Sequence, residues 1–151
     1  GLILWLTAAV FLHTLGILGL PWMTENVYVS IWWWDHLTHA LSSSIVAGVG
    51  YAIARALDGY IDDLDFPPGF MFAFILLVTL ATGVLWEIIE FVVAELSVTI
   101  GIDPALTQYG VSDTMLDLVF NALGAVIVAL WGVTRLEPIS EAIRIRLERH
   151  R

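Results

Sequence analysis

Histidine and carboxylate side chains recur at helical spacing inside three long apolar stretches of the sequence. Residues three or four positions apart share one face of a helix, so each set would project as a group. Imidazole nitrogens and carboxylate oxygens together are ligands for divalent zinc, manganese or iron. The candidate ligands are Asp35, His36, His39, Glu87, Asp113, Asp117 and Asn121, and Glu90 lies beside them. The pattern predicts a divalent metal site assembled from three helices.

An ionisable side chain in a membrane helix indicates a function, because it costs about 2.5–3.5 kcal/mol to place one at the helix centre. Five carboxylates cannot all be ionised close together without cations, so either bound metal neutralises them or some carry protons. In the metal hypothesis, His39, Glu87 and Asp117 hold the ion, and Asp35 orients the imidazole of His39. Glu90 is then the candidate catalytic base. This favours a metal-dependent enzyme that acts on a lipid-like substrate.

The apolar stretches are long enough to cross a bilayer, which takes about 20 helical residues. Four spans are predicted, at about residues 2–20, 35–57, 69–100 and 113–133. The chain of 151 residues is 59% hydrophobic and 14% charged, which excludes an ordinary soluble domain. Its net charge of -9 excludes a basic face for nucleic acid, and the absence of cysteine excludes thiolate metal ligands.

The predicted fold is therefore an all-α, integral membrane four-helix bundle over residues 1–134, followed by a tail over residues 135–151. We expect a multi-pass protein of the cell membrane, in contact with the lipid bilayer. The tail places Leu136, Ile139, Ile143 and Leu147 at helical spacing. It is predicted to be either an amphipathic helix on the membrane surface or a solvated cytoplasmic extension.

Orientation follows from the basic residues, which are six arginines and no lysine. Arg55 ends the second predicted span, Arg135 follows the fourth, and the other four lie in the tail. The positive-inside rule therefore predicts that both termini are cytoplasmic. In this orientation the three polar sets lie at similar depth in the outer half of the membrane. Small residues follow them in the inner half, which predicts a cup that opens outward; they are Ala47, Gly50, Gly83, Gly124 and Ala125.

Two other functions remain open at this point. One is a non-catalytic membrane subunit, or a structural and interaction protein, in which the polar residues satisfy one another and join other membrane subunits. The other is a proton or ion relay, or a transporter, that loads its carboxylates from outside. The apolar, small inner halves of the spans count against a simple pore.

The order of these polar residues resembles that of the YjdF-like membrane proteins, a family of unknown function. The resemblance covers residues 32–133 and rests on Trp34-Asp35-His36-x-x-His39, Trp86-Glu87-x-x-Glu90, Gln108-Tyr109-Gly110, Asp113-Thr114-x-x-Asp117 and Asn121-x-x-Gly124-Ala125. It implies the helical fold and the polar set but no reaction. The chain is most similar to a short archaeal branch found in salt-loving organisms. An acidic, lysine-free composition is typical of a high-salt cytoplasm, where charge keeps proteins soluble.

Overall fold

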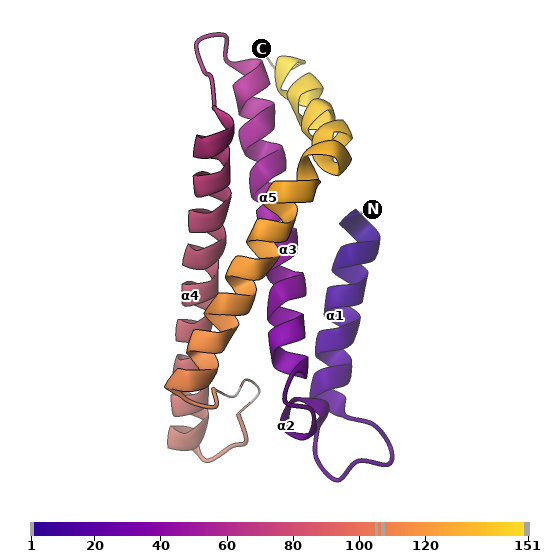
Figure 1. Cartoon of the computed structure of the whole chain (residues 1–151). Helices are drawn as coiled ribbons and strands as arrows, with labels where there is room; N and C mark the ends of the chain where they lie inside the picture. The colour runs from indigo at the N-terminus through magenta and orange to yellow at the C-terminus, as the bar shows by residue number, and fades with distance from the viewer. Residues whose placement is uncertain (1, 105, 107, 150–151) are drawn as a thin grey trace.

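A computed structural model describes residues 2–104, 106 and 108–149, and the side chains of all of these except residues 2 and 131–135. Two arginines of the orientation argument, Arg135 and Arg151, thus fall outside the described side chains. The elements are α1 (Leu2–Leu18), α2 (Val27–Ser30), α3 (Trp34–Tyr60), α4 (Pro68–Ile100) and α5 (Val111–Glu148). The described residues contain no β-strand, which confirms the all-helical fold class. Figure 1 shows the long helices side by side.

Three helical segments are long and apolar enough to cross a membrane: α3, α4 and the Val111–Leu130 part of α5. Helix α1, at the place of the first predicted span, is also apolar but has 17 residues. At about 1.5 Å per residue it is roughly 25 Å long, against about 30 Å for the hydrocarbon core of a bilayer. The structure therefore supports three candidate spans and one shorter apolar helix.

Glycine, proline and asparagine fix where the helices end. Helix α1 is followed by Gly19 (φ 71°) and α4 by Gly101 (φ 75°), both in the left-handed conformation that glycine adopts without steric cost. Helix α4 begins with Pro68, whose missing N–H is not needed in the first turn. The side chain of Asn26 caps α2 by accepting a hydrogen bond of 3.0 Å from the Val29 backbone N–H.

Helix α3 is the centre of the molecule and packs against α1, α4 and α5. Its tightest approach is to α5, where a Cβ placed on Gly124 would overlap the backbone carbonyl oxygen of Ala40. Ala47 and Ala125 are buried in the same region, as close packing of membrane helices requires. Gly50 does not belong to this contact, because a Cβ placed there would meet nothing within 4 Å. The close helix packing expected at Gly50 is therefore wrong.

Helix α5 continues beyond the predicted fourth span into the tail. Pro138 lies inside it, and Figure 1 shows that the helix changes direction toward its C-terminal end. The proline ring clashes with the carbonyl four residues earlier, which bends a helix without ending it here. Leu136 joins the buried cluster of the bundle, and Ile139 packs against that cluster. The first turns of the tail thus pack against the bundle.

Candidate metal centre

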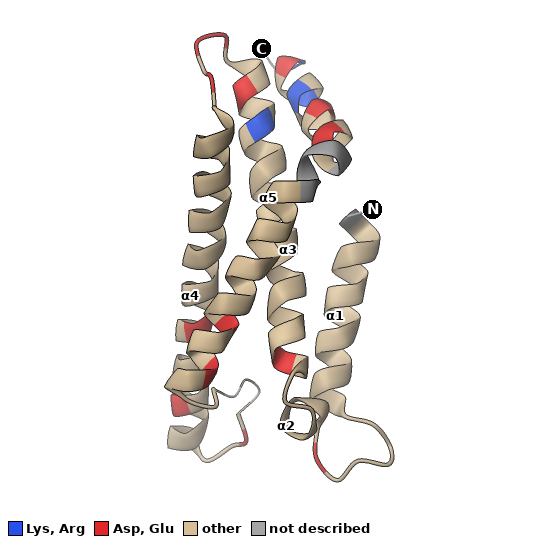
Figure 2. Cartoon of the chain, viewed as in Figure 1, with Lys and Arg blue, Asp and Glu red and all other residues tan. Residues whose placement is uncertain are grey.

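The polar residues of three helices meet at one end of the bundle. Helices α3 and α5 begin at this end and α4 ends there, so residues far apart in the sequence reach similar depth (Figure 1). Figure 2 shows acidic residues of all three helices gathered at this end, whereas the described basic residues lie at the other. The convergence that helical spacing and topology predict is present in the structure.

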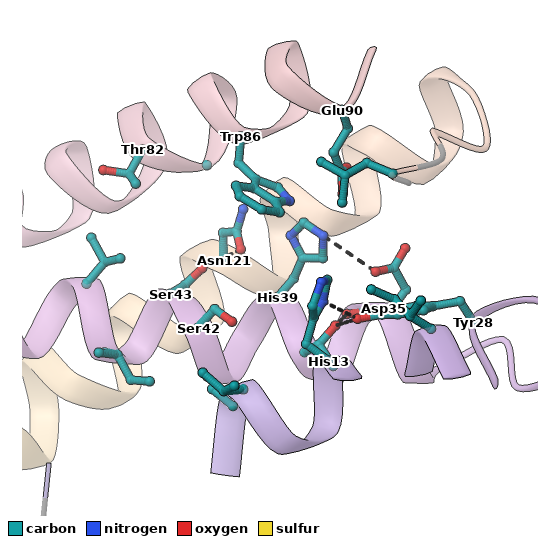
Figure 3. A pocket seen from close by; sticks show the side chains of 18 of the residues that line it. His13, Tyr28, Asp35, His39, Ser42, Ser43, Thr82, Trp86, Glu90 and Asn121 are labelled. Atoms are coloured by element: carbon teal, nitrogen blue, oxygen red, sulfur yellow. Dashed lines mark hydrogen bonds and ion pairs between the residues drawn. The ribbon is translucent and has the colours of Figure 1, made fainter. Parts of the chain in front are cut away.

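His39 lies at the middle of the cluster, with a carboxylate on each side of its ring. Its Nε2 atom is 3.5 Å from Oδ1 of Asp35, one turn earlier on α3. Its Nδ1 atom is 3.8 Å from Oε1 of Glu87 on α4. Figure 3 shows the ring between Asp35 on one side and Trp86 and Glu90 on the other. Asp35 is thus placed to orient the imidazole while Nδ1 faces the glutamates.

Glu87 is buried, with 5% of its surface exposed, and its two oxygens have different surroundings. Oε2 accepts a hydrogen bond of 3.0 Å from the Thr114 hydroxyl, which in turn accepts one of 3.0 Å from the Gln108 amide. Oε1 has no hydrogen-bond partner among the described residues. A buried carboxylate oxygen without a partner is costly, so this atom is available for a ligand.

His36 forms a second polar contact with α5. Its Nδ1 atom is 2.9 Å from Oδ1 of Asp117, and both side chains are buried. The ring stacks on Phe120, with ring centroids 4.9 Å apart and an angle of 11° between the planes. The stacking fixes the plane of the imidazole, and the bond to Asp117 leaves Nε2 as the second nitrogen that could bind an ion.

Three overlapping groups of side chains have ligand atoms within 4.8 Å of one another. They are His39, Glu87 and Glu90; His36, Asp113 and Asp117; and Asp35, His39 and Asp117. The first two groups share no residue, and the third takes a member from each. The structure thus brings every predicted His and carboxylate into these three groups, and the first two groups could each hold a metal ion.

Asn121, the remaining predicted ligand, lies one turn deeper on α5 and is 2% exposed. Its amide oxygen accepts a hydrogen bond from the Ser43 hydroxyl of α3. A Cβ placed on Gly83 of α4 would overlap the Asn121 amide nitrogen, so the glycine makes room for it. Asn121 therefore joins three helices directly beneath the cluster, and beside His39 (Figure 3).

His13 of α1 lies near the cluster but has a different partner. Its Nδ1 atom is 2.7 Å from the hydroxyl of Tyr28 on α2. Burial raises the pKa of Tyr28 to about 12, so the phenol stays protonated. His13 is in none of the three ligand groups found among the described residues. Its contact with Tyr28 joins α1 to α2.

Thr114 and Gln108 belong to the motifs that carry the family resemblance, but neither is among the predicted site residues. Both support Glu87 through the hydrogen bonds described above. Thr114 lies three residues before Asp117, on the same face of α5, and that spacing was the available signal. Gln108 lies in the loop before α5, where no helical period applies.

The sequence matches the model of a family described as "predicted membrane protein (DUF2238)" over residues 1–138. The chain belongs to this family. It is also 34% identical over 126 residues to an uncharacterised protein of Thermotoga maritima, an alignment that covers 83% of the chain and 58% of the relative. The chain thus spans somewhat more than half the length of that relative. No solved structure matches the chain. Membership of the DUF2238 family and the three candidate spans together identify a multi-pass membrane protein in contact with the lipid bilayer.

Proposed function

We propose that this DUF2238 protein binds a divalent metal ion within the membrane through His39, Glu87 and Glu90. The observation that carries the proposal is the 3.8 Å between His39 Nδ1 and Glu87 Oε1. This distance is too long for a hydrogen bond. It suits two atoms bound to one ion, which lie at most about 4.2 Å apart when each bond is about 2.1 Å. Glu87 Oε1 has no other partner among the described residues, and an ion would satisfy it.

The charge of the cluster supports the same proposal. Five carboxylates surround two histidines. Among the described residues, no lysine or arginine lies in the cluster to balance the negative charges. A divalent ion would offset the repulsion among the acids in this low-dielectric setting. The adjoining set of His36, Asp113 and Asp117 could hold a second ion. The mixed nitrogen and oxygen donors suit zinc, manganese or iron.

An enzymatic role follows if the ion keeps a position open to substrate. A divalent ion polarises water and carbonyl or phosphoryl oxygens. Glu90 lines the cavity beside His39, and the Glu90 carboxylate oxygen that does not bind the ion would accept a proton from such a water molecule. Asp35 would hold the His39 ring in place from its Nε2 side. We therefore propose a metal-dependent reaction on a lipid-like substrate, with Glu90 as the catalytic base.

Elemental analysis of the purified protein tests the metal proposal. The wild-type chain is expected to carry at least one divalent ion per chain, and His39→Ala is expected to lose it. Removing a residue that only hydrogen-bonds to a metal ligand lowers metal affinity by about 10- to 100-fold. Loss of the ligand His39 itself should lower the affinity for the ion by more than this. His13→Ala is the matched control, because His13 lies close by but bonds to Tyr28. Absence of metal from the wild type, or equal metal in His39→Ala, would overturn the proposal.

A structural polar network is the second candidate function. It is favoured by the hydrogen bonds that join the helices: His36 to Asp117, Ser43 to Asn121 and Thr114 to Glu87. Such bonds between membrane helices contribute only about 0.6 kcal/mol each on average. In this alternative the protein is a non-catalytic subunit, and the cluster holds its helices in register without an ion.

We further propose that α1 also crosses the membrane, which makes four spans in all, and that both termini are cytoplasmic. The described basic residues support this orientation, because they lie at the end of the bundle away from the cluster (Figure 2). The cluster would then open to the outside. The tail from residue 135 would lie on the cytoplasmic side or along the inner membrane surface.

Single cysteines test the orientation cleanly, because the chain has none of its own. Glu25→Cys, in the exposed loop after α1, is expected to react in intact cells with a maleimide that cannot cross membranes. Asp63→Cys, in the exposed loop between α3 and α4, should react only after the cells are opened. The opposite labelling pattern would reverse the proposed orientation. Equal labelling of the two cysteines in intact cells would contradict the proposal that α3, which lies between them, crosses the membrane.

We also propose, from the composition, that the chain comes from a halophilic archaeon. Fifteen acids against six arginines, with no lysine, suit a protein of a high-salt cytoplasm. The four aspartates near the loop between α3 and α4 would face that cytoplasm: Asp58, Asp62, Asp63 and Asp65. This pattern favours a YjdF-like protein from a halophilic archaeon.

A further inference from the structure

A cavity of about 520 Å³ lies beside the cluster, lined mainly by α1, α3 and α4. This volume is within the range of about 300–1,000 Å³ that is usual for small-molecule sites. His39 and Glu90 line it, but most of its wall is not explained by the proposed metal site. The cavity therefore has room for a ligand larger than an ion.

The depth of the cavity matches one leaflet of a bilayer. Its lining runs from Ile17 back to Leu6 on α1, from Asp35 to Val46 on α3 and, through Glu90, back to Thr79 on α4. Each stretch covers eleven helical steps, or roughly 16 Å. Half of the hydrocarbon core of a bilayer is about 15 Å thick. A hydrocarbon chain of one leaflet would fill the cavity along its length.

The two ends of the cavity differ in chemistry. The end near the loops carries Asp35, His39 and Glu90, and the deep end carries Leu6 and Val46. An amphiphile has the same division between a polar head and an apolar chain. The deep end also holds the hydroxyl of Thr79, which is 1% exposed and has no hydrogen-bond partner among the described residues.

The cavity is open on the side where α1 and α4 do not meet. Among the described elements, α1 packs against α2 and α3 but not against α4. Residues that line the cavity on both sides of this gap are exposed: Val10 by 58% on α1 and Trp86 by 39% on α4. In a membrane, this gap faces lipid. A ligand could therefore enter sideways from the bilayer, with its chain already in an apolar environment.

We propose that the cavity binds a single-chain anionic amphiphile, such as a fatty acid or a lysophospholipid, that enters between α1 and α4. Its chain lies between Val10 of α1 and Val46 of α3. Its head oxygens reach the ion held by His39, Glu87 and Glu90. The head-group contact rests on the proposed metal function, whereas the chain site rests on the cavity alone.

Photo-crosslinking tests the chain site in the full-length protein in nanodiscs. The probe is a 16-carbon fatty acid with a diazirine at mid-chain, and labelled peptides are mapped by mass spectrometry. Labelling is expected on the cavity side of α1 and α4. Val46→Trp fills the cavity and should reduce labelling about tenfold if the indole displaces two methylene groups. Val49→Trp is the matched control, since Val49 is 40% exposed on α3 and lies outside the cavity lining.

Competition identifies the head group. Unlabelled palmitate and unlabelled lysophosphatidylglycerol are compared, and the stronger competitor shows whether the site prefers a carboxylate or a phosphate. If Val46→Trp does not fold, Val10→Trp on the exposed face of α1 replaces it. Equal labelling in the wild type and the cavity-filling variant would overturn the inference. So would a stable dimer that covers the gap between α1 and α4 and excludes the probe.

The metal and the amphiphile proposals fail separately in this design. Val46→Trp should keep the metal content of the wild type, because Val46 is far from the ligand groups along α3. In His39→Ala, the unlabelled anionic amphiphiles should compete less strongly with the probe. The cavity should still accept the hydrocarbon chain of the probe. A metal-free wild type whose labelling depends on Val46 would retain the chain site and reject the metal site.

Discussion

Glu87→Gln is expected to abolish the gain in thermal stability that divalent ions give the wild-type protein. An ion at about one hundred times its dissociation constant stabilises a folded protein by about 2.7 kcal/mol. Glutamine has the shape of glutamate and can still accept the hydrogen bond from Thr114. It lacks the charge that holds a cation beside His39 Nδ1. The substitution therefore removes the ion while the supporting hydrogen bonds stay.

Thermal unfolding in detergent, followed by tryptophan fluorescence with and without added zinc or manganese, measures this effect. Glu95→Gln is the matched control, because Glu95 lies on the same helix but is exposed and outside the three ligand groups. It should respond to metal as the wild type does. If the wild type gains no stability from any of these ions and Glu87→Gln is destabilised without metal, the structural network is the better account of the cluster.

Much of the fold could be predicted from apolar length and from helix-ending residues. The spans expected at residues 35–57 and 69–100 correspond to α3 (Trp34–Tyr60) and α4 (Pro68–Ile100). Proline before α4 and glycine after it set those bounds, and both signals are local. The course of α5 through Pro138 was less predictable. Whether a proline ends a helix or bends it depends on packing, here that of Leu136 against the bundle.

The members of the candidate site could be predicted better than their partners. Spacings of three and four residues place Asp35 and His39, or Glu87 and Glu90, on one helix face. They do not say how far each helix is rotated about its axis. The pairing of His36 with Asp117, and of His39 with Glu87, depends on that rotation. Sequence reasoning therefore could not separate the two ligand sets.

The sequence predicts a polar cup but not the apolar cavity that continues from it. The cavity depends on the gap between α1 and α4, and apolar helices give no sign of which neighbours they lack. Val46 of α3 faces this gap, whereas Val49, one turn away, does not line it. Both are valines in an apolar run, so only the three-dimensional arrangement distinguishes their roles.

Gly124→Ala is expected to be the most destabilising of the small substitutions in the bundle. The added Cβ would overlap the backbone carbonyl of Ala40 and lie 3.2 Å from the backbone nitrogen of Ser44. Backbone atoms cannot turn aside as a flexible side chain can, so α3 and α5 would have to separate. Overpacking of this kind costs about 1–3 kcal/mol. Because α3 and α5 together carry the set of His36, Asp113 and Asp117, their separation would also weaken metal binding at that set.

Gly50→Ala on α3 is the matched control for Gly124→Ala. Nothing lies within 4 Å of a Cβ placed on Gly50, so the substitution should leave stability unchanged or raise it by up to about 1 kcal/mol. Unfolding in mixed micelles of increasing dodecyl sulfate content measures both variants on one scale. Equal stability of the two would show that α3 and α5 are not held in contact at Gly124. A loss confined to Gly124→Ala, with a parallel loss of metal, would show that this contact sets the spacing of the ligands.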